Sequence, residues 1–295
     1  MSPENEKSTY YTYSLKLVHL VLIAFIFLIV PAGAVDLDAL NNSCINCHKN
    51  ISPTADKQSS DNFQQWSDSG HSRNFVTCDY CHGGNPNITS KTGAHYTMKN
   101  VTDPESPIYF KNIPQTCGKC HDTELEHFKN TMHYERLRAE SRAPSCATCH
   151  QPHSFKVLKA SELAPTCRVC HNEKDQVASA NVPEDAKIAL EKADELQNEI
   201  ITLRNSITEA KAKGIDVSSA QNDLDKASSV MKDVPSLWHS FNLKAFDTQI
   251  QTGIDSAKKA QNKLIEVEPT VPPVPGIGMV TVLGIIITLY IFRKR

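Results

Sequence analysis

Apolar residues recur at alternating spacings of three and four positions in the last third of the chain, with polar residues between them. This spacing is the a/d pattern of helices that pack along one seam. Gly214 and Pro235 interrupt it, and we expect each of them to end a helix. The pattern predicts an antiparallel bundle of three helices over residues 181–268. Its predicted seam consists of Ala186, Ala189, Ala193, Leu196, Ile200, Leu203, Ile207, Ala210, Val217, Ala220, Leu224, Ala227, Met231, Leu243, Phe246, Ile250, Gly253, Ala257, Ala260, Leu264 and Val267.

A shorter apolar run lies near the N-terminus, from Leu17 to Val30, and follows Lys16. The run is short for a spanning helix, and the small residues in 31–34 are typical of a cleavage site. We therefore predict a signal peptide over residues 1–34. The alternative is an uncleaved N-terminal anchor.

The C-terminus carries another apolar segment, because residues 276–292 are uncharged and three basic residues follow them. We predict a proline-rich linker over 269–275 and a transmembrane anchor with a basic tail over 276–295. The order of proline-glycine, apolar helix and basic end resembles the C-terminal sorting signals of archaeal surface proteins, although Ile277 stands where those signals usually have phenylalanine. The tail is either a permanent anchor or is exchanged for a lipid. In both cases we expect a membrane-anchored protein that faces the periplasm or the cell exterior.

Residues 35–180 contain all ten cysteines, and each cysteine belongs to one of five C-x-x-C-H motifs. This motif marks covalent attachment of haem c, in which two thioethers hold the haem and the histidine binds its iron as the proximal ligand. We therefore predict a pentahaem cytochrome c domain with five covalently attached haem c groups. The cysteines are Cys44, Cys47, Cys78, Cys81, Cys117, Cys120, Cys146, Cys149, Cys167 and Cys170, and the proximal histidines are His48, His82, His121, His150 and His171.

Zinc sites and disulfides are the other uses of cysteine pairs. Five pairs cannot be divided evenly into four-cysteine zinc sites, and neither zinc nor a disulfide requires a histidine after every pair. The motifs are also too closely spaced for each stretch of chain to bury much apolar surface by itself. We therefore expect haem to supply much of the core. The predicted fold class is mainly α: a loop-rich multihaem domain, then the three-helix bundle and a C-terminal transmembrane helix.

Each haem iron has a sixth coordination position, on the side away from the proximal histidine. Leaving out His19 of the predicted signal peptide, six histidines outside the motifs are candidates for five irons. His153 follows His150 by three residues, so we expect it to bind a neighbouring iron. Met98 and Met132 are the less favoured alternatives. The six candidate histidines are His71, His95, His127, His133, His153 and His239.

Several of these histidines stand in segments that resemble the distal-ligand segments of the hydroxylamine oxidoreductase and cytochrome c nitrite reductase superfamily. The segments are WSDSGH (66–71), AHYTM (94–98), FKNTMH (128–133) and CHQPH (149–153). The stretch HSFNLKAFDTQIQTGIDSAKKAQ (239–261) is similar to a helix of the nitrite reductases in which a histidine–asparagine segment supplies a haem ligand. The resemblance implies that the bundle packs against the haems. It implies His71, His95, His133, His153 and His239 as distal ligands, with His127 in reserve.

The chain departs from the enzymes of that superfamily, because it is much shorter and has no C-x-x-C-K motif. We therefore expect an electron-transfer protein rather than an enzyme, in which mostly bis-histidine haems carry electrons between a membrane donor and an extracytoplasmic acceptor. The alternative is a haem enzyme that converts a small nitrogen or sulfur compound at one five-coordinate haem. A third possibility is a structural protein that polymerises into a conductive filament.

The net charge of −2 gives no sign of a nucleic-acid partner. The expected partners are redox proteins, or a quinol or methanophenazine-type donor in the membrane. The sequence favours no oligomeric state.

Overall fold

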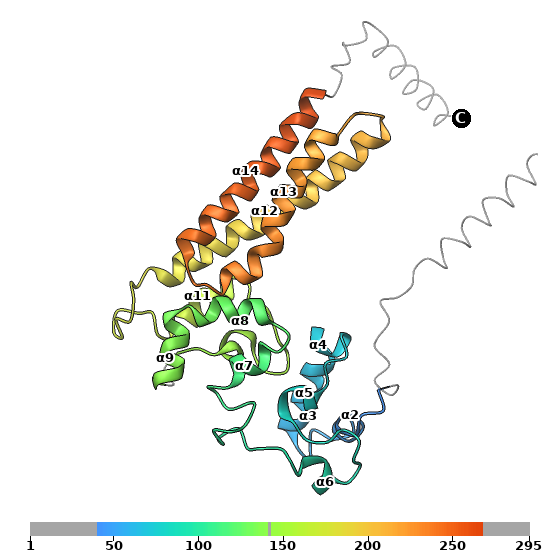
Figure 1. Cartoon of the computed structure of the whole chain (residues 1–295), viewed down its shortest axis with the longest axis vertical. Helices are drawn as coiled ribbons and strands as arrows, with labels where there is room; N and C mark the ends of the chain where they lie inside the picture. The colour runs from blue at the N-terminus through green and yellow to red at the C-terminus, as the bar shows by residue number, and fades with distance from the viewer. Residues whose placement is uncertain (1–39, 141–142, 268–295) are drawn as a thin grey trace, which may run out of the picture. The chain divides into compact units, whose positions relative to one another are not determined.

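The computed structural model describes residues 40–140 and 143–267, and these ranges contain helices and loops without a strand (Figure 1). The chain divides into two compact units, each of which is described by itself. Unit 1 comprises residues 1–116 and 145–157, and unit 2 comprises residues 117–144 and 158–295.

Unit 1 is built of short helices joined by loops. Polar side chains begin several of these helices, because Asn42, Asp56 and Ser69 each accept a backbone N–H from the first helical turn. Helices this short are marginal on their own and depend on tertiary contacts. They are α2 (Ser43–His48), α3 (Lys57–Ser67), α4 (Gly70–Arg73), α5 (Cys78–His82), α6 (Lys91–His95) and α10 (Cys146–His150), while α7 (Ile113–Cys117) spans the sequence boundary between the units.

Unit 1 buries few apolar side chains. In its described part these are Ile45, Trp66 and Pro114. The Trp66 indole N–H donates to the Val76 carbonyl oxygen at 2.9 Å and closes the loop that contains α4. An apolar core of this size is too small to stabilise a unit of about 90 residues alone, which agrees with the expectation that haem completes it.

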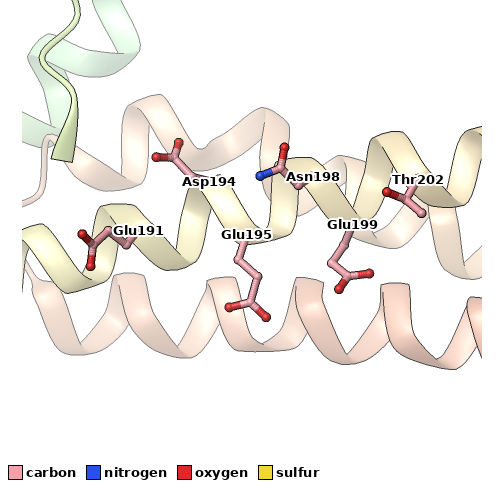
Figure 2. Close-up of a pocket in the computed structure, with 6 residues that line it drawn as sticks. All are labelled: Glu191, Asp194, Glu195, Asn198, Glu199 and Thr202. Carbon is pink, nitrogen blue, oxygen red and sulfur yellow. The ribbon is translucent and has the colours of Figure 1, made fainter. Parts of the chain in front are cut away.

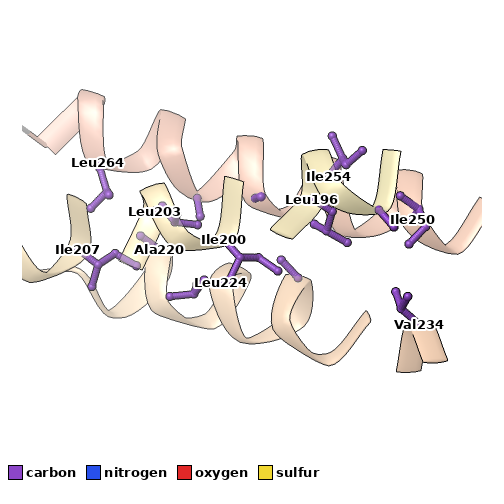
Figure 3. Close-up of a cluster of buried hydrophobic side chains, with 14 of the residues drawn as sticks. Leu196, Ile200, Leu203, Ile207, Ala220, Leu224, Val234, Ile250, Ile254 and Leu264 are labelled. Atoms are coloured by element: carbon purple, nitrogen blue, oxygen red, sulfur yellow. The ribbon is translucent and has the colours of Figure 1, made fainter. Parts of the chain in front are cut away.

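Unit 2 contains the three long helices that the apolar spacing predicts. They pack as an antiparallel bundle, and buried leucine, isoleucine and alanine side chains line the interior (Figures 1 and 3). Every predicted seam residue of the first long helix is buried, because a/d positions lie on one face. The helices of unit 2 are α8 (Asp122–Lys129), α9 (Met132–Glu140), α11 (Ala160–Arg168), α12 (Val182–Ala212), α13 (Ser218–Trp238) and α14 (Leu243–Val267).

Two glycines shape the bundle. Gly214 has a φ of +76° just after α12 and ends that helix, as predicted. At Gly253 in α14, a Cβ would lie 2.7 Å from the Leu196 Cδ2 atom, so a larger residue there would have to displace the buried Leu196 side chain. The small seam residues therefore set the spacing of the helices.

The bundle also contains a buried carboxylate. The Asp223 side chain is 3% exposed, and it accepts hydrogen bonds from Lys263 at 2.5 Å and from Lys226 at 3.2 Å. Lys263 is on α14 and Asp223 on α13, so this ion pair joins two helices. The hydrogen bond from Lys263 lowers the pKa of Asp223 below its usual value, and the one from Lys226 adds to this effect.

One helix boundary differs from the prediction, because α13 continues through Pro235 and ends at Trp238. A proline lacks the N–H that a helix interior needs. Here it stands in the last turn, where Val234, Leu237 and Trp238 pack against the bundle core and offset the lost hydrogen bond.

Within residues 40–140 and 143–267, no helix has the length and apolar character to cross a membrane. The predicted signal peptide (1–34), linker (269–275) and anchor (276–295) lie outside the described residues.

Candidate haem-binding sites

Each C-x-x-C-H motif forms a turn of helix. Helices α2, α5 and α10 end at the motif histidine. In the third and fifth motifs the backbone N–H of His121 donates to the Cys117 carbonyl oxygen at 3.0 Å, and that of His171 donates to the Cys167 carbonyl oxygen at 2.9 Å. Positions i, i+3 and i+4 of a helix lie on one face. Both thiols and the imidazole of each motif are therefore placed to hold a single haem.

The first two motifs are tied together within unit 1. The Asn42 side-chain amide, just before α2, donates to the Asp79 carboxylate in α5 at 3.1 Å. The Thr77 hydroxyl donates to the same carboxylate at 2.6 Å. The Ser43 N–H donates to the Pro86 carbonyl oxygen at 2.8 Å. These contacts fix the positions of the two motif helices, and hence of two haem attachment points, relative to each other.

Two motif histidines of unit 1 each face a histidine from outside the motifs. His48 lies beside His95, with ring centres 6.2 Å apart and ring planes at 47°. His82 lies beside His153, with ring centres 5.7 Å apart and nearly parallel planes at 13°. His153 therefore faces the second motif, although in sequence it stands next to the fourth.

Unit 2 contains a third pair of the same kind. His171 of the fifth motif and His133 of α9 have ring centres 5.9 Å apart, with planes at 89°. His133 comes from a segment before the fourth motif, whereas His171 closes the fifth. The structure thus brings three of the proposed distal histidines next to proximal ones.

The spacing of these pairs fits a haem iron. A metal–imidazole bond is about 2 Å long, so two imidazoles on opposite sides of one iron have ring centres about 6 Å apart. The three pairs, at 6.2, 5.7 and 5.9 Å, all agree with this value.

Two candidate ligands have the same kind of backbone partner, a carbonyl oxygen four residues earlier in the chain. The Nδ1 of His95 lies 2.7 Å from the Lys91 carbonyl oxygen, and the Nδ1 of His239 lies 2.6 Å from the Pro235 carbonyl oxygen. A carbonyl oxygen can only accept, so Nδ1 carries the proton and Nε2 keeps the lone pair that metal binding requires. This shared arrangement is compatible with the predicted ligand role of both rings.

Burial favours the neutral form of four of the paired imidazoles. Desolvation, with a smaller contribution from the nearby His171, lowers the pKa of His133 to about 4. Desolvation is also the largest cause of the lowered pKa of His48, His82 and His153. A histidine must be neutral to bind a metal, so burial prepares these side chains for ligation at neutral pH.

Burial has the opposite effect on three motif cysteines. Desolvation raises the pKa of Cys78 to about 12, and it also raises the pKa of Cys44 and of Cys167. These side chains are thiols rather than thiolates. None of the ten cysteines, all in the described part of the chain, is in a disulfide.

The remaining candidate histidines are divided between the units. His71, on α4, lies in unit 1 with His150, whereas His127 and His239 lie in unit 2 with His121. His127 is on α8, and His121 is the N-cap residue of the same helix.

Two aromatic side chains near these histidines were not singled out by the sequence patterns. Phe155 contacts His71, with ring centres 4.1 Å apart, and Phe241 contacts His133 at 4.4 Å. The signal that could have found them is the tripeptide His-Ser-Phe, which occurs at 153–155 and again at 239–241.

The described residues contain no group of three or more His, Cys, Asp or Glu side chains that could hold a metal ion by themselves. The surface of α12 has a hollow lined by acidic and polar side chains (Figure 2). Glu191 and Glu195 in it face Lys187 and Lys258, at 3.7 Å and 4.0 Å. We interpret it as the solvated charged face of the bundle.

Residues 62–151 match the family model described as cytochrome c7 and related cytochrome c. The matched region is cytochrome c7-like. It contains the second, third and fourth motifs, and it indicates a multihaem c-type cytochrome, with covalently bound haem c, that transfers electrons. The bundle and the first and fifth motifs lie outside this cytochrome c7-like region. Comparisons with curated proteins and with solved structures found no match.

Proposed function

We propose that the protein is a membrane-anchored pentahaem cytochrome c that carries electrons along bis-histidine haems. The observation that carries this proposal is the set of three imidazole pairs with ring centres 5.7–6.2 Å apart. Each pair joins the histidine of a C-x-x-C-H motif to a histidine from a distant segment. When haem is bound, its iron supplies the one-electron chemistry, and the chain supplies position, ligands and insulation.

On the basis of these three pairs we assign ligands for three haems. His48 and His95 would hold the iron of the first haem, and His82 and His153 that of the second. His171 and His133 would hold the iron of the fifth haem.

The other two assignments follow by elimination within each unit. In unit 1, His150 is left with His71. In unit 2, His121 is left with His127 or His239, and we assign His239. Its Nδ1 contact with a carbonyl oxygen four residues back is the arrangement that also orients His95.

Histidine on both faces of each iron determines the kind of chemistry. With two imidazoles as its ligands, each iron would have no open position for a substrate unless a ligand left. A bis-histidine iron also lacks the methionine that raises the potential of mitochondrial-type cytochromes. The arrangement favours electron transfer at low potential over catalysis.

The partners and location that we propose rest on the sequence. The C-terminal segment 276–295 holds the protein at a membrane, and the cleaved signal segment 1–34 places the haems in the periplasm or outside the cell. The electron donor is then a quinol or methanophenazine-type carrier in the membrane, or a redox protein, and the acceptor is extracytoplasmic. The resemblance to the hydroxylamine oxidoreductase and nitrite reductase superfamily is part of this proposal.

Electron paramagnetic resonance (EPR) of the oxidised, purified full-length protein, together with its mass, tests the proposal. We expect five covalent haems and low-spin ferric signals from all of them. A high-spin signal from one haem in five would instead support an enzyme with an open iron. Fewer than five haems would overturn the pentahaem assignment.

A further inference from the structure

The two His-Ser-Phe segments share two local features, although φ at the histidine differs, +69° at His153 and −72° at His239. In His153-Ser154-Phe155 the serine hydroxyl donates to the Gln151 carbonyl oxygen at 3.4 Å, and in His239-Ser240-Phe241 it donates to the Leu237 carbonyl oxygen at 2.7 Å. Each acceptor stands three residues before the serine. Each phenylalanine has a positive φ, +46° at Phe155 and +51° at Phe241.

A positive φ is unusual at a bulky residue. Glycine reaches the left-handed region without strain, whereas other residues in sparsely populated regions cost on the order of 1–3 kcal/mol. Such strain persists where surrounding contacts hold it. At both positions the phenylalanine ring makes contacts that can offset this cost.

Both rings meet the edge or face of a candidate haem ligand. Phe155 and His71 are nearly perpendicular, at 78°, and Phe241 and His133 are at 84°. Edge-to-face contacts of this kind favour one relative orientation of two rings. The Phe241 ring is itself placed beside Phe128, whose side chain is buried in the cluster of α8 and α9.

The histidine and the phenylalanine of each segment are associated with two different haems. His153 faces the proximal histidine of the second haem, while Phe155 contacts His71, which we assign to the fourth. His239 is assigned to the third haem, while Phe241 contacts His133, which faces the proximal histidine of the fifth. In each segment, the histidine is therefore assigned to one haem, and the phenylalanine contacts a histidine that is assigned to another.

We propose that each His-Ser-Phe segment is a clamp between two haems: its histidine binds one iron, and its phenylalanine fixes the rotation of the axial imidazole on a second iron. Phe155 and Phe241 are positioning residues, since they act through His71 and His133. The inference rests on the proposed function and goes further, because it states what sets the orientation of two ligand planes and which haem pairs are coupled.

Imidazole orientation has a direct spectroscopic consequence. The π orbital of each axial imidazole interacts with an iron d orbital whose direction depends on the ring plane. Rotating one ring therefore changes the energies of the d orbitals, the g values of the ferric iron and its reduction potential. A structural role in folding alone does not move the g values of a single haem.

The test replaces each phenylalanine in the full-length protein. In Phe241→Leu we expect all five haems to stay attached, while the low-spin EPR signal of one haem moves to new g values and its potential shifts. In Phe155→Leu a different low-spin signal should move. Phe241→Tyr and Phe155→Tyr retain the ring and should keep the parent spectrum.

Two further variants make the result decisive. Phe241→Gly removes the ring but tolerates the positive φ, so it should show the same spectral change as Phe241→Leu even if the leucine variant folds poorly. Phe75→Leu is the control, because Phe75 also has a positive φ, of +60°, but is 56% exposed. This control should leave all signals in place.

Unchanged g values and potentials in Phe155→Leu and Phe241→Leu, with five haems attached, would overturn the clamp. That result leaves the proposed function standing if the parent is fully low-spin. A high-spin haem or fewer than five haems in the parent counts against the proposed function itself, so the two failures are distinguishable.

Discussion

His133 and His171 stand perpendicular to each other, with ring centres 5.9 Å apart and planes at 89°. His82 and His153 have a similar spacing of 5.7 Å, but their planes are only 13° apart. In the proposed assignment, the two pairs would therefore hold their irons with different angles between the imidazole planes. We expect the haems that they bind to differ in electronic structure.

The oxidised protein should therefore show two distinct kinds of low-spin ferric signal. Parallel imidazole planes separate the energies of two iron d orbitals and give a rhombic EPR spectrum. Perpendicular planes keep those energies close and give a strongly anisotropic signal with a large highest g value. Low-temperature EPR should resolve both kinds, and His133→Ala should remove the strongly anisotropic one. A uniform rhombic spectrum would contradict the geometry of the His133–His171 pair.

Replacing His153 should open one iron without loss of haem. His153→Ala keeps both thiols and the proximal histidine of every motif, so five haems should remain attached. The second haem loses its sixth ligand, and its potential should rise because a strong nitrogen donor to the ferric iron is gone. Optical and EPR spectra should gain a high-spin component from one haem in five, and the reduced protein should bind carbon monoxide. His127→Ala is the control, and an unchanged spectrum in His153→Ala would show that His153 is not a ligand.

Haem attachment should follow the motifs one by one. The parent should have the mass of five covalent haems and no thiol that can be alkylated. Replacing both cysteines of the third motif, Cys117→Ser with Cys120→Ser, should give a protein with four haems. Lys119→Ala, at an exposed position inside the same motif, should still carry five. Cysteines that can be alkylated in the mature parent protein would contradict the assignment of all five motifs to covalent haem.

The buried Asp223 should stabilise the bundle at neutral pH. Asp223→Asn removes a charged hydrogen-bond acceptor, and losing such a bond typically costs about 1.5–3 kcal/mol. Because the folded-state pKa is lowered, the stabilisation is present above the unfolded pKa of about 3.9 and is lost as the pH falls through the folded-state value. Chemical unfolding followed by circular dichroism should show a less stable variant at pH 7, with the difference shrinking below about pH 4. Asp225→Asn, exposed on the same helix, should behave like the parent at both pH values.

Removal of the C-terminal segment should detach the protein from the membrane. A chain that ends at residue 275 retains every motif and the whole bundle, so it should be red and soluble. Fractionation of cells that express each form measures this directly. If the truncated form stays with the membrane while its haems are attached, the N-terminal segment is an uncleaved anchor.

Features that depend only on residues close together in the sequence could be predicted from it. A C-x-x-C-H motif holds its thiols and its imidazole within one helical turn, so it identifies the haem attachment point without reference to the rest of the fold. The a/d spacing of α12 identified its buried face for the same reason, because a helix repeats its own geometry. The predicted end of α13 at Pro235 was wrong, because packing of Val234 and Trp238 against the bundle outweighed the effect of the proline.

The sequence by itself thus indicated haem c as the cofactor, predicted its attachment residues and determined the bundle. The tertiary structure alone decided which histidines face each other, because the sixth ligand of an iron comes from a segment far along the chain. His153 is next to His150 in sequence but lies against His82 in space. The spacing of histidines along the chain does not encode this relationship. It depends on how the motif helices are placed in space, and contacts such as the one between Asn42 and Asp79 hold that placement.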